Sequence, residues 1–381
     1  MLHKILTAVE KNNKKNAMAV LVNMVDWTQA FDRQSHFLGI KAFVESGVRE
    51  SLIPVLKSFF QNRRMKVKWN GECTKEYKLN GGSPQGDIMG ILEFLAQTNK
   101  NADFLNEDER FKFIDDLSFL EILNLAVLGL TLYDFQTHVP SDIGVQNKFL
   151  PATSFESQRY LDNLSEWTKN QQMKLNPDKS KYLIVNFTHD YQFSTRLMLE
   201  GKPLDQITEA QLLGVKINDK LTWDSNTEHI VKKAYKKMMI LHNLYPFKLP
   251  IHEMVNIYIL YIRSGLEYAA VVWHSSLTVA NQEAIERVQK VALRIILKDQ
   301  YIDYSNALSL TGLTTLSERR TLLCTKFARK CVKNEKTKHM FPLNHKKANT
   351  RKPEKYFVQP SRTERLQKSA IPYMQRLLNS L

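Results

Sequence analysis

The chain has 381 residues, of which 43% are hydrophobic, so it can bury a sizeable core and does not have the composition of a disordered protein. Its formal charge of +15 at pH 7 makes a polyanion the first partner to consider. Three cysteines without a CxxC pair exclude a disulfide framework or zinc knuckle, and no apolar run has the length of a signal peptide or membrane span.

The first third of the chain predicts strands and helices in alternation. Residues 17–25 are almost continuously apolar and β-branched, which predicts a strand covered on both faces that stops at Asp26. Residues 35–60 carry apolar side chains at helical spacing. Residues 63–69 alternate apolar and basic side chains, which predicts a half-exposed strand with a basic face, and a Gly-rich turn follows at residues 80–86.

Residues 111–120 predict two short strands that meet at a pair of aspartates. A second carboxylate group therefore lies at the tip of an apolar strand. Further along, residues 159–174 predict an amphipathic helix, residues 176–179 a turn, and residues 181–187 another strand.

Beyond Trp223 the pattern predicts helices alone, at residues 227–244, 251–262, 279–298 and 317–334. Residues 326–381 hold 15 Lys and Arg side chains against three Glu. Such a run is as often a solvated tail as a nucleic-acid contact. We expect three regions: a mixed α/β region at 1–222, a helical region at 223–335, and a basic C-terminal tail at 336–381.

The strand-end carboxylates Asp26 and Asp115 are candidates for binding a pair of Mg²⁺ ions, a cation that prefers oxygen ligands. Two such ions suit phosphoryl transfer, in which one activates a hydroxyl and the other stabilises the leaving pyrophosphate. Adjacent side chains on a strand point to opposite faces, so Asp115 ranks above Asp116 unless a tight turn rotates one of them. An isolated Asp-Asp pair is usually a solvated turn, but this pair has the apolar neighbours Phe113, Ile114, Leu117 and Phe119.

Five motifs in one order resemble those of reverse transcriptases of non-LTR (LINE-type) retrotransposons. The first runs from a hydrophobic residue through Asp26 and three variable residues to Ala-Phe-Asp. Gly-Ser-Pro-Gln-Gly, Phe-Ile-Asp-Asp, Leu-Asn-Pro-Asp-Lys-Ser and Leu-Leu-Gly-Val follow, and the five motifs lie at residues 25–32, 82–86, 113–116, 175–180 and 212–215. The resemblance covers roughly residues 17–335.

The resemblance implies an α/β fold with a reverse-transcriptase palm, an antiparallel sheet with packed helices, followed by an α-helical thumb and post-polymerase region. It implies an RNA-directed DNA polymerase that adds dNTPs to a primer 3′-hydroxyl with two Mg²⁺ ions, Mn²⁺ being an alternative. The implied partners are an RNA template and a DNA primer. No membrane partner is expected, and the chain is expected inside the cell, with the nucleus as one candidate compartment.

Roles carried over from the family fall on named positions. Asp26, Asp115 and Asp116 match the metal ligands, and Lys179 matches a lysine proposed to assist pyrophosphate departure, its alternative being a solvated turn residue. Phe31 matches the aromatic side chain that blocks a ribose 2′-hydroxyl, although spacing alone fits a core Phe equally well.

Other predicted contacts concern the nucleotide and the two strands. Gln85 and Gly86 match residues that line the nucleotide and template, with a simple turn as the alternative, and Ile114 would narrow the nucleotide pocket. Leu213 and Gly214 match the primer grip. A basic strand is expected to contact backbone phosphates, unless it is only an exposed sheet face, through Arg63, Arg64, Lys66 and Lys68.

The sequence departs from the family pattern in ways that favour a second hypothesis. In the family a fingers region precedes the first catalytic motif, but here Asp26 lies near Met1, so we expect most of that region to be missing. No endonuclease domain is recognised. Ile114 replaces a smaller residue, and Asp87 follows Pro-Gln-Gly where Ser or Cys is commoner. The alternatives are a catalytically inactive nucleic-acid-binding remnant of a retroelement and, less favoured because of Phe31, an RNA-dependent RNA polymerase.

Overall fold

The computed structural model describes residues 1–10, 17–83, 86–101, 103–105, 107–128, 147–188, 192–344 and 355–380. Contacts divide the chain into two compact units. Unit 1 holds Met1 and Lys11–Thr208, and unit 2 holds Leu2–Glu10 and Glu209–Leu381.

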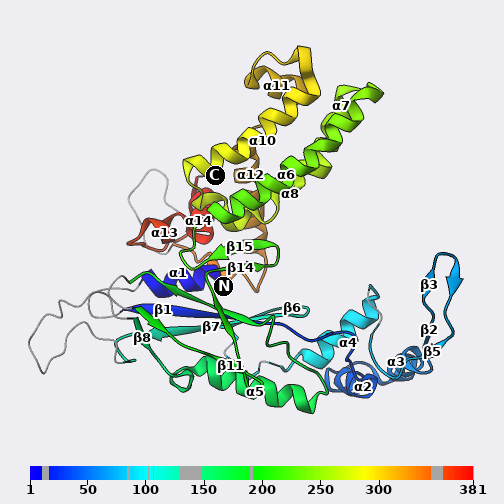
Figure 1. The fold of residues 1–381 in the computed structure, drawn as a ribbon. Helices are drawn as coiled ribbons and strands as arrows, with labels where there is room; N and C mark the ends of the chain where they lie inside the picture. The colour runs from blue at the N-terminus through cyan, green and yellow to red at the C-terminus, as the bar shows by residue number, and fades with distance from the viewer. Residues whose placement is uncertain are drawn as a thin grey trace, which may run out of the picture. The chain divides into compact units, whose positions relative to one another are not determined.

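Unit 1 is built on a five-stranded sheet with the order β13-β9-β1-β7-β6 (Figure 1). The central strand β1 (Met18–Val25) is antiparallel to β7 (Asp116–Asn124) and to β9 (Lys181–Asn186). β6 (Arg110–Phe113) pairs antiparallel with β7, whereas β13 (Asp205–Ile207) is a parallel edge strand beside β9. The predicted α/β fold with a mainly antiparallel sheet is confirmed.

The burial of β1 follows from its sequence. Ala19, Val20, Leu21 and Val22 are all fully buried, so both sets of alternating side chains are covered, as the unbroken apolar run predicts. The one polar interior residue, Asn23, is also buried and donates a hydrogen bond from Nδ2 to Ser157 Oγ at 2.8 Å. Burial on both faces makes this strand the rigid centre of the sheet.

Among the described residues of unit 1, the sheet is accompanied by the α-helices α2 (His36–Glu45), α3 (Ile53–Phe60), α4 (Ile88–Thr98) and α5 (Glu156–Asn170). α5 lies along the sheet in Figure 1, and its side chains Leu161 and Leu164 share one hydrophobic core with Leu21 and Phe119. Short 3₁₀ turns occur at Glu50–Leu52 (η1) and Ala152–Ser154 (η2). The helical spacing predicted at residues 35–60 and 159–174 corresponds to α2, α3 and α5, whereas α4 was not predicted.

Smaller two-stranded ribbons complete unit 1. They pair β2 (Arg64–Met65) with β5 (Tyr77–Lys78), β3 (Lys68–Trp69) with β4 (Glu72–Cys73), β8 (Asn147–Phe149) with β10 (Gln192–Ser194), and β11 (Met198–Leu199) with β12 (Lys202–Pro203). β2 to β5 form one hairpin that follows α3 and projects from it (Figure 1).

Unit 2 begins with a hairpin of β14 (Glu209–Leu212) and β15 (Val215–Asn218) and is otherwise helical. Its longer helices are α1 (Leu2–Glu10), α6 (Asp224–Leu244), α10 (Val279–Leu297), α11 (Tyr304–Thr311), α12 (Leu316–Lys333) and α14 (Ala370–Asn379). Shorter ones are η3 (Tyr245–Phe247), α7 (Ile251–Ile257), the π-helix η4 (Tyr258–Arg263), α8 (Ser264–Glu267), α9 (Ala270–Trp273), η5 (His274–Ser276), η6 (Lys298–Gln300), η7 (Lys338–Met340) and α13 (Glu364–Gln367). The helical region predicted after Trp223 is therefore present.

The structure places the division between units at Thr208, whereas the sequence suggested residue 222. The β14–β15 hairpin groups with the helices because β15 packs on α6. Its Lys216 N–H donates to Asn226 Oδ1 of that helix at 3.1 Å. The sequence pattern places residues 209–218 in the mixed α/β region because the all-helical pattern begins only after Trp223, and their contacts assign them to the following helices.

The segment expected as a basic tail contains folded elements within its described part. α14 packs against α12, and Phe341, Tyr356 and Met374 enter a core with Cys324 and Ala328 of α12. The described part of this segment is therefore folded against α12 rather than being a solvated tail. None of the helices in the described ranges is both long and apolar enough to cross a membrane.

Candidate functional site

Three carboxylates lie at one end of neighbouring strands in unit 1. Asp26 follows directly on the last residue of β1, and Asp116 is the first residue of β7. The register pairs Val25 with Leu117, so the next positions along the two antiparallel strands are Asp26 and Asp116. The structure thus brings together side chains that are ninety positions apart in the chain.

A tight hairpin presents the third carboxylate. β6 and β7 pair up to Phe113 and Asp116, which leaves only Ile114 and Asp115 to make the turn. Ile114 has φ +55, a left-handed conformation that is unfavourable for a β-branched side chain. This turn is the device that lets two adjacent aspartates serve the same end of the sheet.

The three carboxylates influence one another electrostatically. Partial burial raises the pKa of Asp116, and the negative charges of Asp115 and of Asp26 raise it further. Such mutual repulsion is relieved when a cation binds among the oxygens. Carboxylate oxygens are the ligands that Mg²⁺ prefers. In the described residues, however, no three His, Cys, Asp or Glu side chains are spaced as a closed metal site.

The expectation of an apolar frame around the aspartates is only half correct. Leu117 and Phe119 are buried in the core, but the Phe113 side chain is 58% exposed. Phe113 lies beside the turn in β6, where its side chain faces away from the core that Leu117 enters. Asp115 and Asp116 are also exposed at residue level. The site is therefore open to a ligand.

The turn that carries Lys179 is bound to the backbone of Asp26. The Asn176 N–H donates to the Asp26 carbonyl at 2.9 Å, and the Asp26 N–H donates to Ser180 Oγ at 3.0 Å. Thr28 adds bonds from its N–H to the Lys174 carbonyl and from Oγ1 to the Leu175 carbonyl, both at 2.9 Å. The structure thus brings the turn with the exposed Lys179 to the end of β1.

Phe31 lies in a turn after β1, and its ring packs against Phe94 with centroids 5.1 Å apart. It is half-buried against the hydrophobic core. A core role and a role beside the nucleotide both stay open for Phe31, because its ring packs on the core but is only partly buried. Its carbonyl accepts the Ser83 N–H at 2.9 Å, which fixes the turn to the Gly-rich segment.

The Gly-rich segment runs closely beside that turn. The Gly82 N–H donates to the Gln34 carbonyl at 2.8 Å, and His36 Nε2 contacts the Gly82 carbonyl at 2.8 Å. Gly82 has φ +80, and a Cβ placed there would lie 3.0 Å from the Asp32 carbonyl oxygen. A glycine is required here because both the conformation and the space exclude a side chain.

The structure places Gly86 in an exposed position, whereas Gln85 lies outside the described residues. Gly86 has φ +88 with open space where a Cβ would be. Asp87, one of the departures from the family pattern, caps α4 by accepting the Met89 N–H at 2.8 Å. Its role in the described structure is to begin this helix.

A buried acid that the sequence analysis missed lies behind the Gly-rich segment. Glu93 of α4 is fully buried, and it accepts a short hydrogen bond from Ser83 Oγ. A Cβ at Gly39 of α2 would collide with its carboxylate. Burial raises the pKa of Glu93 to about 7, while the Ser83 hydrogen bond and the charge of Arg63 oppose this rise. A Glu inside the apolar run of residues 88–98 was the available signal.

The residues predicted to contact phosphates differ in the contacts that their side chains already make. Arg64 and Lys66 both pair with Glu76, at 3.0 and 3.2 Å. The Arg63 guanidinium lies over the Phe59 ring, 5.7 Å from its centroid. Lys68 is exposed in β3. The hairpin therefore presents a basic surface that is only partly neutralised.

The predicted primer-grip residues form the turn of the β14–β15 hairpin in unit 2. Leu213 and Gly214 both have positive φ, at +46 and +80, as a two-residue hairpin turn requires. The Tyr268 hydroxyl donates to the Leu213 carbonyl at 2.8 Å, and a Cβ at Gly214 would lie 3.1 Å from the Tyr268 ring. Tyr268, the residue after α8, therefore holds the exposed turn of the hairpin in place.

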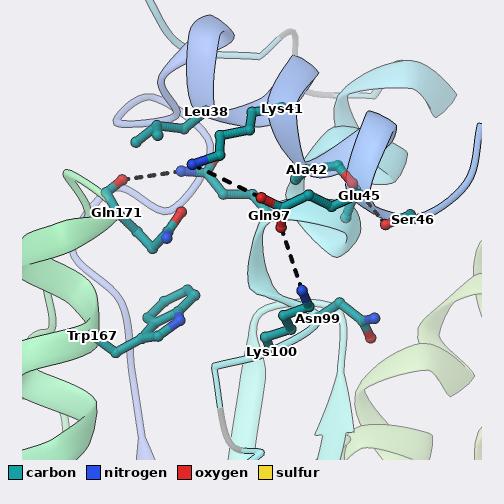
Figure 2. Close-up of a pocket in the computed structure, with 11 residues that line it drawn as sticks. Leu38, Lys41, Ala42, Glu45, Ser46, Gln97, Asn99, Lys100, Trp167 and Gln171 are labelled. Carbon is teal, nitrogen blue, oxygen red and sulfur yellow. Dashed lines mark hydrogen bonds and ion pairs between the residues drawn. The ribbon is translucent and has the colours of Figure 1, made fainter.

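A small hollow of about 80 Å³ lies between α2, α4 and the end of α5, and none of the residues that line it is a predicted site residue (Figure 2). Lys100 pairs with Glu45 across its rim at 3.4 Å, and Gln97 Nε2 donates to the Gln171 carbonyl at 3.0 Å. Trp167 forms one wall and packs edge-on against Trp27, the neighbour of Asp26. These contacts link the helices beneath the strand end.

Comparison with known proteins gives a consistent group of relatives, although no family model matches. The chain is 24% identical over 309 residues to a probable RNA-directed DNA polymerase from transposon BS of Drosophila melanogaster, covering 78% of this chain and 30% of the relative. It is 21% identical over 301 residues to that from transposon X-element of the same fly, covering 77% and 29%. It is 27% identical over 283 residues to the RNA-directed DNA polymerase from mobile element jockey of Drosophila funebris, covering 71% and 28%.

The chain therefore spans less than a third of the length of these relatives. Among solved structures, telomerase from Candida tropicalis in complex with a fragment of telomeric RNA aligns over 89% of this chain and 50% of that chain. That alignment has 12% identity and a TM-score of 0.39. The curated relatives confirm the resemblance that the ordered motifs predicted.

Proposed function

We propose that this chain, a homologue of the RNA-directed DNA polymerases of LINE-type elements, performs template-directed addition of deoxynucleotides to a primer 3′-hydroxyl. The observation that carries the proposal is the coupling of Asp26, Asp115 and Asp116 at one end of the sheet. An RNA template, a DNA primer and dNTPs would be the partners. The reaction would take place inside the cell, where such nucleic acids occur.

The carboxylates would hold two Mg²⁺ ions, or Mn²⁺, which when bound activate the 3′-hydroxyl and stabilise the leaving pyrophosphate. Because the described side chains do not form a closed ligand set, we expect metal and nucleotide to draw the three carboxylates together. The strained turn at Ile114 sets the backbone positions of Asp115 and Asp116, from which their side chains would move. Lys179, anchored through its turn to Asp26, would place a cation near the leaving group.

Primer extension on an RNA template tests this proposal. Extension with dNTPs is expected in Mg²⁺ and should disappear when the metal is chelated, because the three carboxylates then keep their mutual repulsion without a counter-ion. Restoring Mg²⁺ should restore the product, and the fraction of primer extended is the measurement. Product of equal yield in excess chelator would contradict a metal-dependent role for the carboxylates.

Phe31 supplies a second test, on the choice of sugar. Phe31→Ala is expected to raise the incorporation of rNTP relative to dNTP by at least about tenfold, because a steric clash in a pocket typically has an effect of that order. The ratio of the two single-nucleotide extension rates is the measurement. Phe37→Ala removes a ring that is 76% exposed on α2 and serves as the matched control. An unchanged ratio would leave Phe31 as a core residue only.

One observation favours the alternative function, a nucleic-acid-binding protein without polymerase activity. Asp115 and Asp116 are exposed and the described carboxylates are not arranged as a ready metal site, while the hairpin after α3 presents basic side chains. This alternative predicts binding that weakens steeply with salt and no extension even when the upstream region of a relative is supplied.

A further inference from the structure

The hairpin formed by residues 62–79, here called the basic hairpin, has a regular ladder and an unusual surface. Its strands pair Met65 with Tyr77 and Trp69 with Glu72. The tip is an Asn70–Gly71 turn in which both residues have positive φ, +48 and +89, the geometry that two-residue hairpins favour. Its shape is therefore well specified by local sequence.

Apolar side chains of the basic hairpin are exposed where a core would normally take them. Trp69 is 83% exposed at the tip, and the exposed neighbours along the hairpin are Met65, Val67 and Tyr77. Trp is among the residues that proteins bury most effectively, and an isolated two-stranded ribbon cannot bury one by itself. A row of exposed apolar side chains of this kind indicates a contact surface.

The charge of the basic hairpin identifies the partner. Residues 63–78 contain six Lys and Arg against two Glu, a net charge of +4. Glu76 is shared by Arg64 and Lys66, and Lys75 lies 5.8 Å from the centre of the Tyr77 ring. Cross-strand pairing also sets Arg64 opposite Lys78, which adds another positive charge beside the Arg64–Glu76 pair.

An aromatic tip flanked by cations matches the chemistry of unpaired nucleotides, whose bases stack on rings while their phosphates attract cations. A base-paired strand offers no free base face to Trp69 except at its end. We propose that the basic hairpin binds single-stranded nucleic acid, with a base stacked on Trp69 and adjoining phosphates near Lys68 and Lys78. This inference deepens the proposed function, because it names the unpaired strand as a ligand of this hairpin.

Binding of a labelled single-stranded RNA or DNA oligonucleotide to the full chain, without dNTP or Mg²⁺, tests the inference. Trp69→Ala is expected to weaken binding between about fivefold and a hundredfold, the range typical for losing one stacked base. Trp69→Phe should retain most of the affinity because it keeps a ring. Lys68→Ala should lower the dependence of log K on log salt by somewhat less than one unit, as expected for one phosphate contact on a single strand.

Phe37→Ala is the matched control, since Phe37 is an equally exposed aromatic residue of unit 1 outside the hairpin. Thermal unfolding of each variant checks that the fold is retained. Affinity of Trp69→Ala within twofold of the unaltered chain, or an equal loss in Phe37→Ala, would overturn the inference. The inference would also be overturned if Trp69→Ala bound the oligonucleotide as well as the unaltered chain did but bound anionic lipid vesicles more weakly.

The outcome is separable from that of the proposed function. If the chain fails to extend a primer but Trp69→Ala still weakens single-strand binding, the hairpin inference stands and the polymerase proposal fails. If the chain extends a primer and the Trp69 variants bind single strands as before, the polymerase proposal stands and the hairpin inference fails.

Discussion

Asp115→Asn is expected to reduce primer extension by at least about a hundredfold. Asparagine keeps the size of the side chain but removes the negative charge that would bind a metal ion, and loss of one electrostatic contact to a transition state often has this effect. Asp115 is exposed in a hairpin turn, so the substitution should leave the thermal unfolding of unit 1 unchanged. The rate of single-nucleotide addition is the measurement.

A matched control is Asp205→Asn, an exposed aspartate of the edge strand β13 in the same unit. It should extend the primer at the rate of the unaltered chain. The Asp115 substitution should also lower the pKa of Asp116, which burial and then the charges of Asp115 and Asp26 raise. Full activity in Asp115→Asn would remove the basis for assigning the carboxylates to catalysis.

Unit 1 is expected to lose stability as the pH rises from about 4.5 to about 7, because of Glu93. In the folded protein its pKa is raised to about 7 from an ordinary value of 4.5. Over this window the folded state keeps a proton that the unfolded chain releases, so the free energy of unfolding falls with pH. Each pKa unit corresponds to about 1.4 kcal/mol, so the expected fall is about 3.5 kcal/mol at most.

Glu93→Gln should abolish this dependence, because Gln resembles the protonated acid and can still contact Ser83. The variant is expected to match the unaltered chain near pH 4 and to exceed its stability near pH 8. Denaturant unfolding of both proteins at the two pH values is the measurement. Glu72→Gln, on the exposed hairpin, should change neither curve. A parallel pH dependence in Glu93→Gln and the unaltered chain would show that Glu93 is not the titrating group.

The strands and helices were largely predictable because their signals are local. The apolar run before Asp26 and the pair of strands around the aspartates both depend on hydrophobic periodicity within a few residues. The relative positions of Asp115 and Asp116 were not predictable in this way. They depend on the left-handed conformation of Ile114 and on the register that sets Asp116 beside Asp26, and this register is a contact between distant segments.

Other features were missed for the same physical reason. The sequence does not show that Glu93 meets Ser83 and Gly39, because the three lie on different segments that only folding brings together. The sequence does not show that residues 209–218 belong to unit 2, because this depends on the packing of β15 on α6. The roles of the predicted site residues stay predictions until the substitutions above are measured.

The attachment of α1 to unit 2 has a consequence for synthesis of the chain. The Glu10 carboxylate accepts the Thr363 N–H at 2.9 Å, a contact between residues 353 positions apart, and α1 packs on α13. At translation rates of about 5–20 residues per second, α1 waits roughly 20 to 70 seconds for that partner to be made. During this time the apolar side chains Ile5 and Val9, buried in the finished protein, have no α13 to cover them. Burial of α1 is therefore completed only after a segment that lies 353 positions further along the chain has been made.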